Sequence, residues 1–565
     1  MDNKQSEQVL EPGILIQSKP GLGKSFVTLA TFAAMALLAP GVQAMAAGEG
    51  VALLEPAAAD SALALRIEQR LRERAAAADE TTALFYLARA YRPVWTEPAR
   101  AEALLAAVEG VRGHGLDPAD FVPTRLRAAL AVETDPDRAA DRELLLTDTL
   151  AALLYRLRHG KVDPHTLYRE WNFTPPPNPY ERAGTLARVL QAPDLAAAVE
   201  AHAPDLPLYR ALRAELLAQQ ARLGAGDWPK VAAGPTLKPG ARTPRVPSLR
   251  ARLAAAGEAV LEARDKTHYD DALVEAVKRF QAAHGLQADG VLGAQTLEAL
   301  NASPVQRVAQ VRANLERLRW VASDLQGDRL LVDIVGYHAD LVLDGRSVWA
   351  SRVIVGKPKR RTPSLLDSVT QLVFNPKWVV PPTILREDVI PGAARNPSYL
   401  ANHRMRVVDR SGHTVDPATI DWGGARQSGF PYRIEQQSGA DGSLGRIKFS
   451  LSNPYVIYLH DTNARSLFNR AERALSSGCV RVEKPAELAV HLLADEERWN
   501  AQALQAALDS GRTRTVDVGR DVKVLLHYAT AALDETGRVL LRNDIYGYDA
   551  AIVAALDVPV GLGSR

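Results

Sequence analysis

The chain has 565 residues, with 68 basic and 66 acidic side chains, 12 histidines and one cysteine, Cys479. This length is enough for about three or four domains, because a domain usually spans roughly 100–200 residues. The mix of 47% hydrophobic and 24% charged residues is typical of a globular protein and excludes a disordered, fibrous or polytopic membrane chain. The near-zero net charge argues against a nucleic-acid binder, and a single cysteine excludes an internal disulfide framework.

The first fifty residues are typical of an export signal. Residues 26–39 form an apolar run that follows two lysines. This run is shorter than the roughly 20 residues that a membrane-spanning helix needs. Small residues follow at 42–46, where a signal peptidase would cleave. We therefore predict a signal peptide over residues 1–46, with an uncleaved membrane anchor as the alternative.

Residues 60–245 favour a helical domain. They are rich in Ala, Leu and Arg, and the segment 142–160 repeats apolar positions at spacings of three and four. The proline-rich block 171–180 is expected to form a loop between helices. Pro and Gly recur over 229–247, which predicts a linker to the next unit.

Residues 250–303 predict a small helical module. Two short helices are expected around the Gly-rich turn after His284. The run F-Q-x-x-H-G-L-x-x-D-G-x-x-G-x-x-T-L-x-x-L in this segment resembles the peptidoglycan-binding domain of bacterial wall hydrolases. The resemblance implies a three-helix-type peptidoglycan-binding domain, and a purely structural spacer is the alternative. Apolar residues spaced by three and four then predict an amphipathic linking helix over 305–325.

From residue 328 to residue 555 the pattern changes to strands. Segments rich in Val, Ile, Tyr and Phe predict a mostly-β domain, and Asp344-Gly345 is a hairpin signal. Residues 376–445 are instead rich in Pro, Gly, Asn and Arg. Such long loops inside a compact domain are usually functional, so we predict a cap inserted into the β domain. The fold class predicted for the whole chain is multidomain α+β.

His460 and Cys479 are the candidate catalytic pair. His460 closes a predicted strand, and Cys479 lies in a turn directly after Gly478. A thiol attacks only as the thiolate, and a histidine within hydrogen-bond reach can take its proton. Gly478 would let the backbone approach a substrate and direct N–H groups at an oxyanion. From this spacing alone, the alternative that Cys479 is a small buried hydrophobic residue stays open.

The residues around this pair resemble the signature of the L,D-transpeptidases, which are cysteine enzymes that cross-link peptidoglycan. His-Asp-Thr at 460–462 is followed by Ser-Ser-Gly-Cys-Val-Arg at 476–481. The general family pattern is His-Gly-Thr, then Ser-His-Gly-Cys, a hydrophobic residue and Arg. Asp461 and Ser477 depart from this pattern, and both departures match the large periplasmic branch that carries a scaffold domain (YcbB-like). The segments at 313–320, 374–385, 444–449 and 542–549 also resemble that branch.

The resemblance implies a role for each residue of the motif. Cys479 would be the nucleophile, and His460 would be the general base and acid, oriented partly by a backbone carbonyl. Asp461 is interpreted as a loop-capping carboxylate rather than a third member of a triad. The predicted oxyanion and substrate residues are Tyr458, Ser477, Gly478, Arg481 and Trp378. Arg481 would hold a substrate carboxylate or pin its loop by a salt bridge. Trp378, with Phe374 and two prolines at 381–382, would line a substrate groove or lie in the core.

The resemblance also implies a reaction and its partners. The thiol would attack the diaminopimelate carbonyl of a donor tetrapeptide, D-alanine would leave, and a second diaminopimelate amine would resolve the thioester to a 3→3 cross-link. The alternatives are an L,D-carboxypeptidase or a hydrolase of wall-attached lipoprotein, a papain-like protease and a non-catalytic wall-binding scaffold. We expect peptidoglycan stem peptides as substrates, carbapenem β-lactams as inhibitors and a periplasmic location. We expect no nucleic-acid partner, no cofactor and no metal, since no HExxH or paired-cysteine motif occurs.

Overall fold

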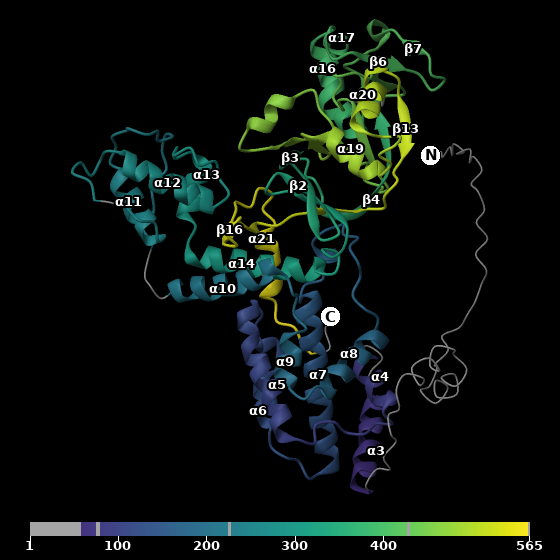
Figure 1. The fold of residues 1–565 in the computed structure, drawn as a ribbon. Helices are drawn as coiled ribbons and strands as arrows, with labels where there is room; N and C mark the ends of the chain where they lie inside the picture. The colour runs from purple at the N-terminus through teal and green to yellow at the C-terminus, as the bar shows by residue number, and fades with distance from the viewer. Residues whose placement is uncertain (1–57, 75–79, 224–227, 261, 426–429, 563–565) are drawn as a thin grey trace, which may run out of the picture.

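The protein is a multidomain α+β chain, with helices in the N-terminal half and strands in the C-terminal half (Figure 1). The computed structural model describes five stretches of the chain, which are residues 58–74, 80–223, 228–260, 262–425 and 430–562. The expected signal peptide at 1–46 lies outside the described residues. Within the described stretches, no helix has both the length and the apolar character needed to cross a membrane. The predicted fold class is confirmed.

The N-terminal part is helical, and most of its helices lie at the bottom of Figure 1. They are α3 (Ala58–Glu73), α4 (Glu80–Ala88), α5 (Pro98–Gly110), α6 (Pro123–Ala128), α7 (Pro136–His159), α8 (Pro179–Gln191), α9 (Leu195–Glu200) and α10 (Pro207–Leu223), with the short 3₁₀ turns η1 (Val111–His114), η2 (Pro118–Phe121) and η3 (Pro164–Thr166). Polar side chains satisfy the helix starts: Asp135 accepts a hydrogen bond at the start of α7, and Asn178 and Glu181 form a capping box on α8. The apolar faces meet in one core, in which Leu150 is fully buried.

Three short helices form the next unit, at the left of Figure 1. They are α11 (Val246–Ala255), α12 (Asp271–Ala283) and α13 (Ala294–Asn301). This unit has a core of its own that includes the buried Leu249, Leu273 and Phe280. Gln281 fixes the Gly-rich turn, because its amide accepts from the Gly290 backbone N–H and donates to the Val291 carbonyl.

Helix α14 (Pro304–Val321) joins this unit to the strands and crosses the centre of the molecule beside α10 (Figure 1). Its spacing predicts an amphipathic helix, yet most of its side chains are buried, the polar ones included. The reason is that other elements cover both sides and satisfy those groups. The buried Arg319 pairs with Glu316 at 2.7 Å and also donates to the Tyr209 hydroxyl. On the other side, Arg317 pairs with Asp549.

The C-terminal half is built on a ten-stranded sheet with the order β11-β3-β12-β10-β9-β4-β14-β1-β2, in which β13 pairs with β4. The strands are β1 (Arg329–Asp333), β2 (His338–Leu343), β3 (Arg346–Gly356), β4 (Leu365–Phe374), β9 (Ile447–Leu451), β10 (Leu459–His460), β11 (Ala474–Ser476), β12 (Val480–Val482), β13 (Arg514–Asp517) and β14 (Lys523–His527). Strand β2 pairs with both β1 and β3, so the sheet closes on itself around an apolar core. The turn η6 (Arg465–Asn469) and the helices α19 (Pro485–Leu493) and α20 (Ala501–Asp509) complete this unit.

The segment between β4 and β9 folds into a small unit at the top of Figure 1. It contains β5 (Trp378–Val379), α15 (Pro382–Ile384), the π-helix η4 (Leu385–Val389), α16 (Ile390–Arg395), α17 (Tyr399–Asn402), β6 (Met405–Val408), β7 (Thr414–Val415), η5 (Pro417–Thr419) and β8 (Arg433–Gln436). Its strands form a separate four-stranded sheet in the order β5-β8-β6-β7. Val389, Leu400, Val407 and Ile434 are buried in a core of its own. We call this unit the cap.

The chain ends by returning to the helical domain. After the hairpin β15 (Ala531–Leu533) and β16 (Val539–Leu541), helix α21 (Asp549–Leu556) leads into a tail that runs toward the helices at the bottom of Figure 1. There Lys161 and Asp120 form a fully buried ion pair at 2.7 Å. Lys161 also donates to the Leu556 carbonyl, and Asp120 accepts from the Val560 backbone N–H.

Candidate active site

The pairing of β10 with β12 places the candidate nucleophile and base on one face of the sheet. These strands are parallel, with Leu459 opposite Val480 and His460 opposite Arg481. Because side chains alternate along a strand, Leu459 and Val480 point into the core, where both are fully buried. His460 and Arg481 therefore share the opposite face. Cys479 precedes β12 and occupies the same face as Arg481, two residues away.

A network of hydrogen bonds fixes the turn that carries the thiol. Gly478 has φ +121°, a conformation that L side chains rarely adopt, so glycine is required here. Its N–H donates to the Ser476 hydroxyl at 3.1 Å, and that hydroxyl donates to the Cys479 carbonyl at 2.6 Å. The buried Thr362 hydroxyl donates to the Gly478 carbonyl at 2.7 Å. The Gly478 N–H is therefore already engaged, which leaves its neighbours as the candidate oxyanion donors.

A cavity of about 450 Å³ opens between this turn and the cap. It brings together the residues that the sequence singled out, which are Trp378, Tyr458, His460, Ser477, Gly478, Cys479 and Arg481. Pro381 also lines it. Phe374, for which the groove and the core were both open, lies in the core against Trp499, with ring centroids 5.3 Å apart. Strand alternation explains this, because Phe374 ends β4 on its inward face.

His460 is arranged to act as a base. Its Nδ1 lies 2.5 Å from the Asp461 carbonyl oxygen, and since a carbonyl only accepts, Nδ1 carries the proton and Nε2 is free to accept one. Burial, together with the positive charges of Arg481 and Lys448, lowers the pKa of His460 to about 3. The imidazole is therefore neutral, and competent as a base, throughout the neutral pH range. The pKa of His460 therefore lies well below the ordinary histidine value near 6.5.

The Asp461 carboxylate does not orient the imidazole. One oxygen accepts from the Arg446 backbone N–H at 2.9 Å, and the other pairs with Arg465 at 2.9 Å. Its bonds are those of a loop-capping group. The contact with His460 comes from the main chain of Asp461.

Cys479 is held as a neutral thiol. Burial raises its pKa, although hydrogen bonds from Tyr458 and the charges of Lys448 and Arg481 act in the opposite direction. Its Sγ donates to the Val456 carbonyl oxygen at 3.6 Å. No hydrogen bond between the described atoms of His460 and Cys479 is present. The thiol must turn from the carbonyl toward the imidazole before it can lose its proton.

The carbonyl that accepts from the thiol belongs to a strained residue. Val456 has φ +59°, and this left-handed conformation is a genuine outlier for a β-branched side chain. The Asn453 side chain holds the loop, since its Oδ1 accepts from the backbone N–H groups of Tyr455 and Ile457. Asp367 in β4 in turn accepts from Asn453. The strain is thus fixed by the sheet and sets the direction of the Val456 carbonyl.

Two cations flank His460, and one of them, Arg481, lines the cavity. Lys448 lies opposite His460 on β9, with its Nζ 4.4 Å from the centre of the Tyr458 ring. Arg481 makes no ion pair with any described residue, and its buried Nε has no hydrogen-bond partner. The salt-bridge role considered for Arg481 therefore has no counterpart here. Lys448 was missed in the sequence, where only strand alternation in the segment 447–451 could have indicated its direction.

The cap is tied to the turn through Arg360, which sequence reasoning also missed. The largely buried guanidinium pairs with Glu387 at 2.8 Å and with Asp388 at 2.5 Å, both in η4 of the cap. It also donates to the Ser477 hydroxyl at 3.0 Å. One side chain therefore joins the loop between β3 and β4, the cap and the residue that precedes Gly478.

Within the described residues, no group of three or more His, Cys, Asp or Glu side chains could hold a metal ion. The arrangement offers nucleophilic chemistry at a thiol, with a neutral imidazole as the proton acceptor. Positive charge surrounds the place where an oxyanion or a substrate carboxylate would lie.

Three family models match successive parts of the chain. They are a "Scaffold domain" at residues 80–216, a "Putative peptidoglycan binding domain" at 242–300 and an "L,D-transpeptidase catalytic domain" at 327–522. A protein of Haemophilus influenzae named "Putative L,D-transpeptidase" is 41% identical over 239 residues, which are 42% of this chain and 48% of that protein. The chain thus spans about half the length of this curated relative.

Two crystal structures with the same enzyme name were also matched. The L,D-transpeptidase of Xylanimonas cellulosilytica is 17% identical, with a TM-score of 0.17, and the match covers 52% of this chain and 99% of that one. The L,D-transpeptidase of Stackebrandtia nassauensis is 13% identical, with a TM-score of 0.17 and coverages of 54% and 98%.

Proposed function

Because the chain combines a scaffold domain, a peptidoglycan-binding domain and an L,D-transpeptidase catalytic domain, we propose that it is a periplasmic L,D-transpeptidase of peptidoglycan. It forms 3→3 cross-links between diaminopimelate residues through a thioester on Cys479. The observation that carries this proposal is the shared cavity under the cap, which is lined by His460 on β10 and by Cys479 directly before the adjacent strand β12.

In the first half-reaction, the Cys479 sulfur attacks the diaminopimelate carbonyl of the donor tetrapeptide. Since the thiol and the imidazole are both neutral at rest, the proton moves to His460 Nε2 as the S–C bond forms. The oxyanion then collapses, the bond to the terminal D-alanine breaks, and His460 returns its proton to the leaving amine. The product is a thioester and free D-alanine.

In the second half-reaction, the side-chain amine of another diaminopimelate attacks the thioester. His460 takes a proton from the attacking amine and passes it to the sulfur as the C–S bond breaks, so that the thiol and the neutral imidazole are both restored. One amide has been exchanged for another, so no ATP is needed.

The oxyanion is stabilised by the Cys479 backbone N–H and the Tyr458 hydroxyl. Burial raises the pKa of Tyr458 well above its ordinary value, so its hydroxyl remains a donor at neutral pH. The Gly478 N–H is excluded from this role, because it donates to Ser476. Gly478 instead provides the backbone conformation that presents Cys479.

The substrate is an anionic peptide, and the charges that line the cavity fit it. Lys359, Arg361 and Arg481 line the cavity, and none of them has an ion pair with a described acidic residue. Arg481 is placed to receive a carboxylate of the stem, next to the reacting atoms. Trp378 lines the same cavity at the edge of the cap and provides an apolar surface.

The experiment is an incubation of the full chain with tetrapeptide muropeptides, followed by mass spectrometry. Dimers with loss of D-alanine support the transferase. Tripeptides alone would indicate the L,D-carboxypeptidase, and unchanged substrate would indicate a non-catalytic scaffold. Cys479→Ala must yield no product with its fold intact.

A carbapenem tests the nucleophile independently of the acceptor. We expect one added drug mass on Cys479 and none on Cys479→Ala. His460→Ala should slow this acylation by at least about 10²-fold, the usual effect of a positioned base. His413→Ala is the matched control, since this cap histidine is 82% exposed. An acylation rate for His460→Ala equal to that of the control would exclude His460 as the base.

A further inference from the structure

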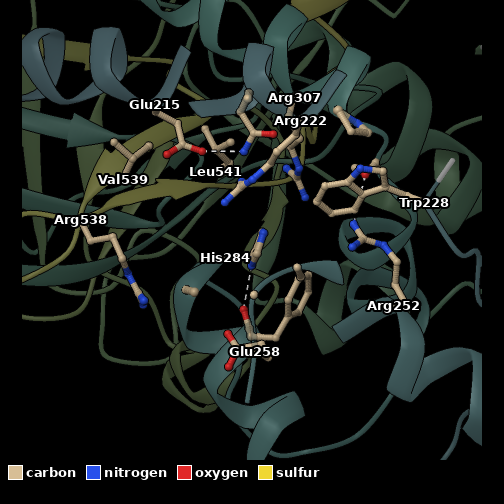
Figure 2. Close-up of a pocket in the computed structure, with 17 residues that line it drawn as sticks. Glu215, Arg222, Trp228, Arg252, Glu258, His284, Arg307, Arg538, Val539 and Leu541 are labelled. Carbon is tan, nitrogen blue, oxygen red and sulfur yellow. Dashed lines mark hydrogen bonds between the residues drawn. The ribbon is translucent and has the colours of Figure 1, made fainter. Parts of the chain in front are cut away.

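A second cavity, of about 250 Å³, lies between the domains and shares no lining residue with the active site (Figure 2). Its walls come from α10 of the helical domain, from α11 and α12 of the peptidoglycan-binding domain, from α14 and from β16. A ligand in this cavity would touch all of these parts of the chain at once.

Guanidinium groups from three different helices face this cavity. They belong to Arg222 of α10, Arg252 of α11 and Arg307 of α14 (Figure 2). Arg252 is only 3% exposed, and its Nη1 has no hydrogen-bond partner. Its guanidinium lies 4.1 Å from the centre of the Trp228 ring. Burial, and to a lesser extent the charges of Arg307 and Arg222, lower the pKa of Arg252 to about 10.

The acidic groups that line the cavity neutralise this charge only in part, since the charge of Glu215 acts on Arg307 and raises its pKa against the effect of burial. Glu258 pairs with Arg279, which lies outside the lining, at 3.2 Å. Glu215 accepts a hydrogen bond from Gln219 at 2.6 Å. Arg222 has no ion pair with any described residue. An excess of positive charge therefore remains in a partly enclosed space, where an anion is bound more strongly than in open water.

His284 adds a hydrogen-bond acceptor to this ring of donors. Its Nδ1 lies 2.8 Å from the Phe280 carbonyl oxygen, so Nδ1 carries the proton and Nε2 carries a lone pair. Burial, together with the charge of Arg307, lowers the pKa of His284 to about 3 and keeps the ring neutral. Figure 2 shows the second ring nitrogen facing the open space of the cavity.

We propose that this cavity binds the carboxyl terminus of a peptide. The carboxylate takes the charge of Arg222 and Arg307, and the terminal amide N–H donates to His284 Nε2. The Trp228 ring covers the apolar side of the terminal residue. Hydrogen phosphate offers charge and an O–H donor but no apolar part to lie against the Trp228 ring, whereas a peptide terminus offers all three.

The inference rests on the proposed function for the identity of the peptide, which is a peptidoglycan stem that ends in D-alanine. Such a stem would be held at the junction of the wall-binding unit and the scaffold, apart from the reacting cavity. Its binding would favour one placement of the peptidoglycan-binding domain against α10.

The test is titration calorimetry of the full chain as Cys479→Ala, with N-acetyl-D-alanine as the probe. Acyl transfer is impossible in this variant, so the result is independent of whether the proposed catalysis is correct. We expect saturable binding that falls at least about tenfold in Arg222→Gln, the usual effect of losing a charge-assisted hydrogen bond. Arg538 also lines the cavity, where it pairs with Asp534 at 3.4 Å, and its side chain is 62% exposed. Arg538→Gln should therefore weaken binding without disturbing a buried core. Arg210→Gln, an exposed control on α10, should bind as well as the parent.

Two comparison probes test whether the cavity recognises a peptide carboxylate rather than any neutral amide or any anion. N-acetyl-D-alanine methylamide lacks the charge and should not bind. Inorganic phosphate should bind more weakly than the peptide-like probe. Equal binding of phosphate, or a titration that is unchanged in both Arg222→Gln and Arg538→Gln, would overturn the proposal.

Discussion

Replacing Thr362 by valine should damage both stability and acylation, because one hydroxyl fixes the turn that carries the nucleophile. Thr362 is fully buried; its hydroxyl accepts from the Gly356 N–H at 2.8 Å and donates to the Gly478 carbonyl at 2.7 Å. Valine has nearly the same shape but leaves both backbone groups without a partner. Each such group costs about 1–3 kcal/mol, so the free energy of unfolding should fall by about 2–6 kcal/mol.

The effect on acylation follows from the position of Gly478 next to Cys479. If the freed carbonyl turns toward water, the sulfur moves with it, and a displacement of about 1 Å can slow a reaction by about 10²-fold. The assay is the rate of carbapenem adduct formation by intact-protein mass spectrometry, together with urea unfolding. Thr362→Ser keeps the hydroxyl and should acylate at nearly the parent rate. If Thr362→Val acylates as fast as Thr362→Ser, the hydroxyl does not hold the turn, and the reasoning fails.

Four further predictions concern the base, the cation beside it, the cap and the buried ion pair of the helical domain. Since burial lowers the pKa of His460 to about 3, the carbapenem acylation rate should not fall between about pH 8 and pH 5; a decline centred near the ordinary pKa of about 6.5 would contradict this. Arg481→Met removes a cation that lowers this pKa, so the base should be lost at a higher pH than in the parent, and an identical profile would refute the coupling. Arg360→Gln should loosen the cap and shorten the lifetime of the acyl-enzyme in water, whereas Arg386→Gln, which is exposed, should not; equal lifetimes would show that the Arg360 contacts do not limit water entry. Lys161→Met leaves a buried carboxylate unpaired and should destabilise the protein by about 3–5 kcal/mol in calorimetric unfolding, and an unchanged midpoint would be inconsistent with a buried ion pair.

The candidate nucleophile and base could be predicted because their signals are local. Alternation of apolar residues around 459 and 480 indicates which side chains turn away from the core, and the motif residues stand within a few positions of one another. Lys448 lies on the neighbouring strand, and alternation in its segment could have indicated only the direction of its side chain, since the strand register that places it opposite His460 is not visible in the sequence. Arg360 could not be found this way, because it reaches the site from a distant loop.

The secondary structure within the cap could not be predicted from the sequence either. Composition marks 376–445 as an insertion, but strands such as β5 and β7 have two residues each, too few to show a period. The strain at Val456 is also invisible in the sequence, because nothing in a valine residue indicates a left-handed backbone. It exists only because Asn453 and the sheet impose it.

The return of the chain end to the helical domain has a consequence for the order of folding. Lys161 and Asp120 are enclosed by backbone that lies about 400 positions later, at Leu556 and Val560. The helices around Lys161 therefore cannot bury this ion pair until residues 556–560 have been synthesised and have packed against them. This differs from the usual order, in which an N-terminal domain folds on its own ahead of the rest. Until then a lysine and an aspartate remain open to water in the middle of the helical domain. Folding of the helical domain should thus be completed together with folding of the ten-stranded sheet. Removal of residues 556–562 should destabilise the helices of that domain before it destabilises the strands.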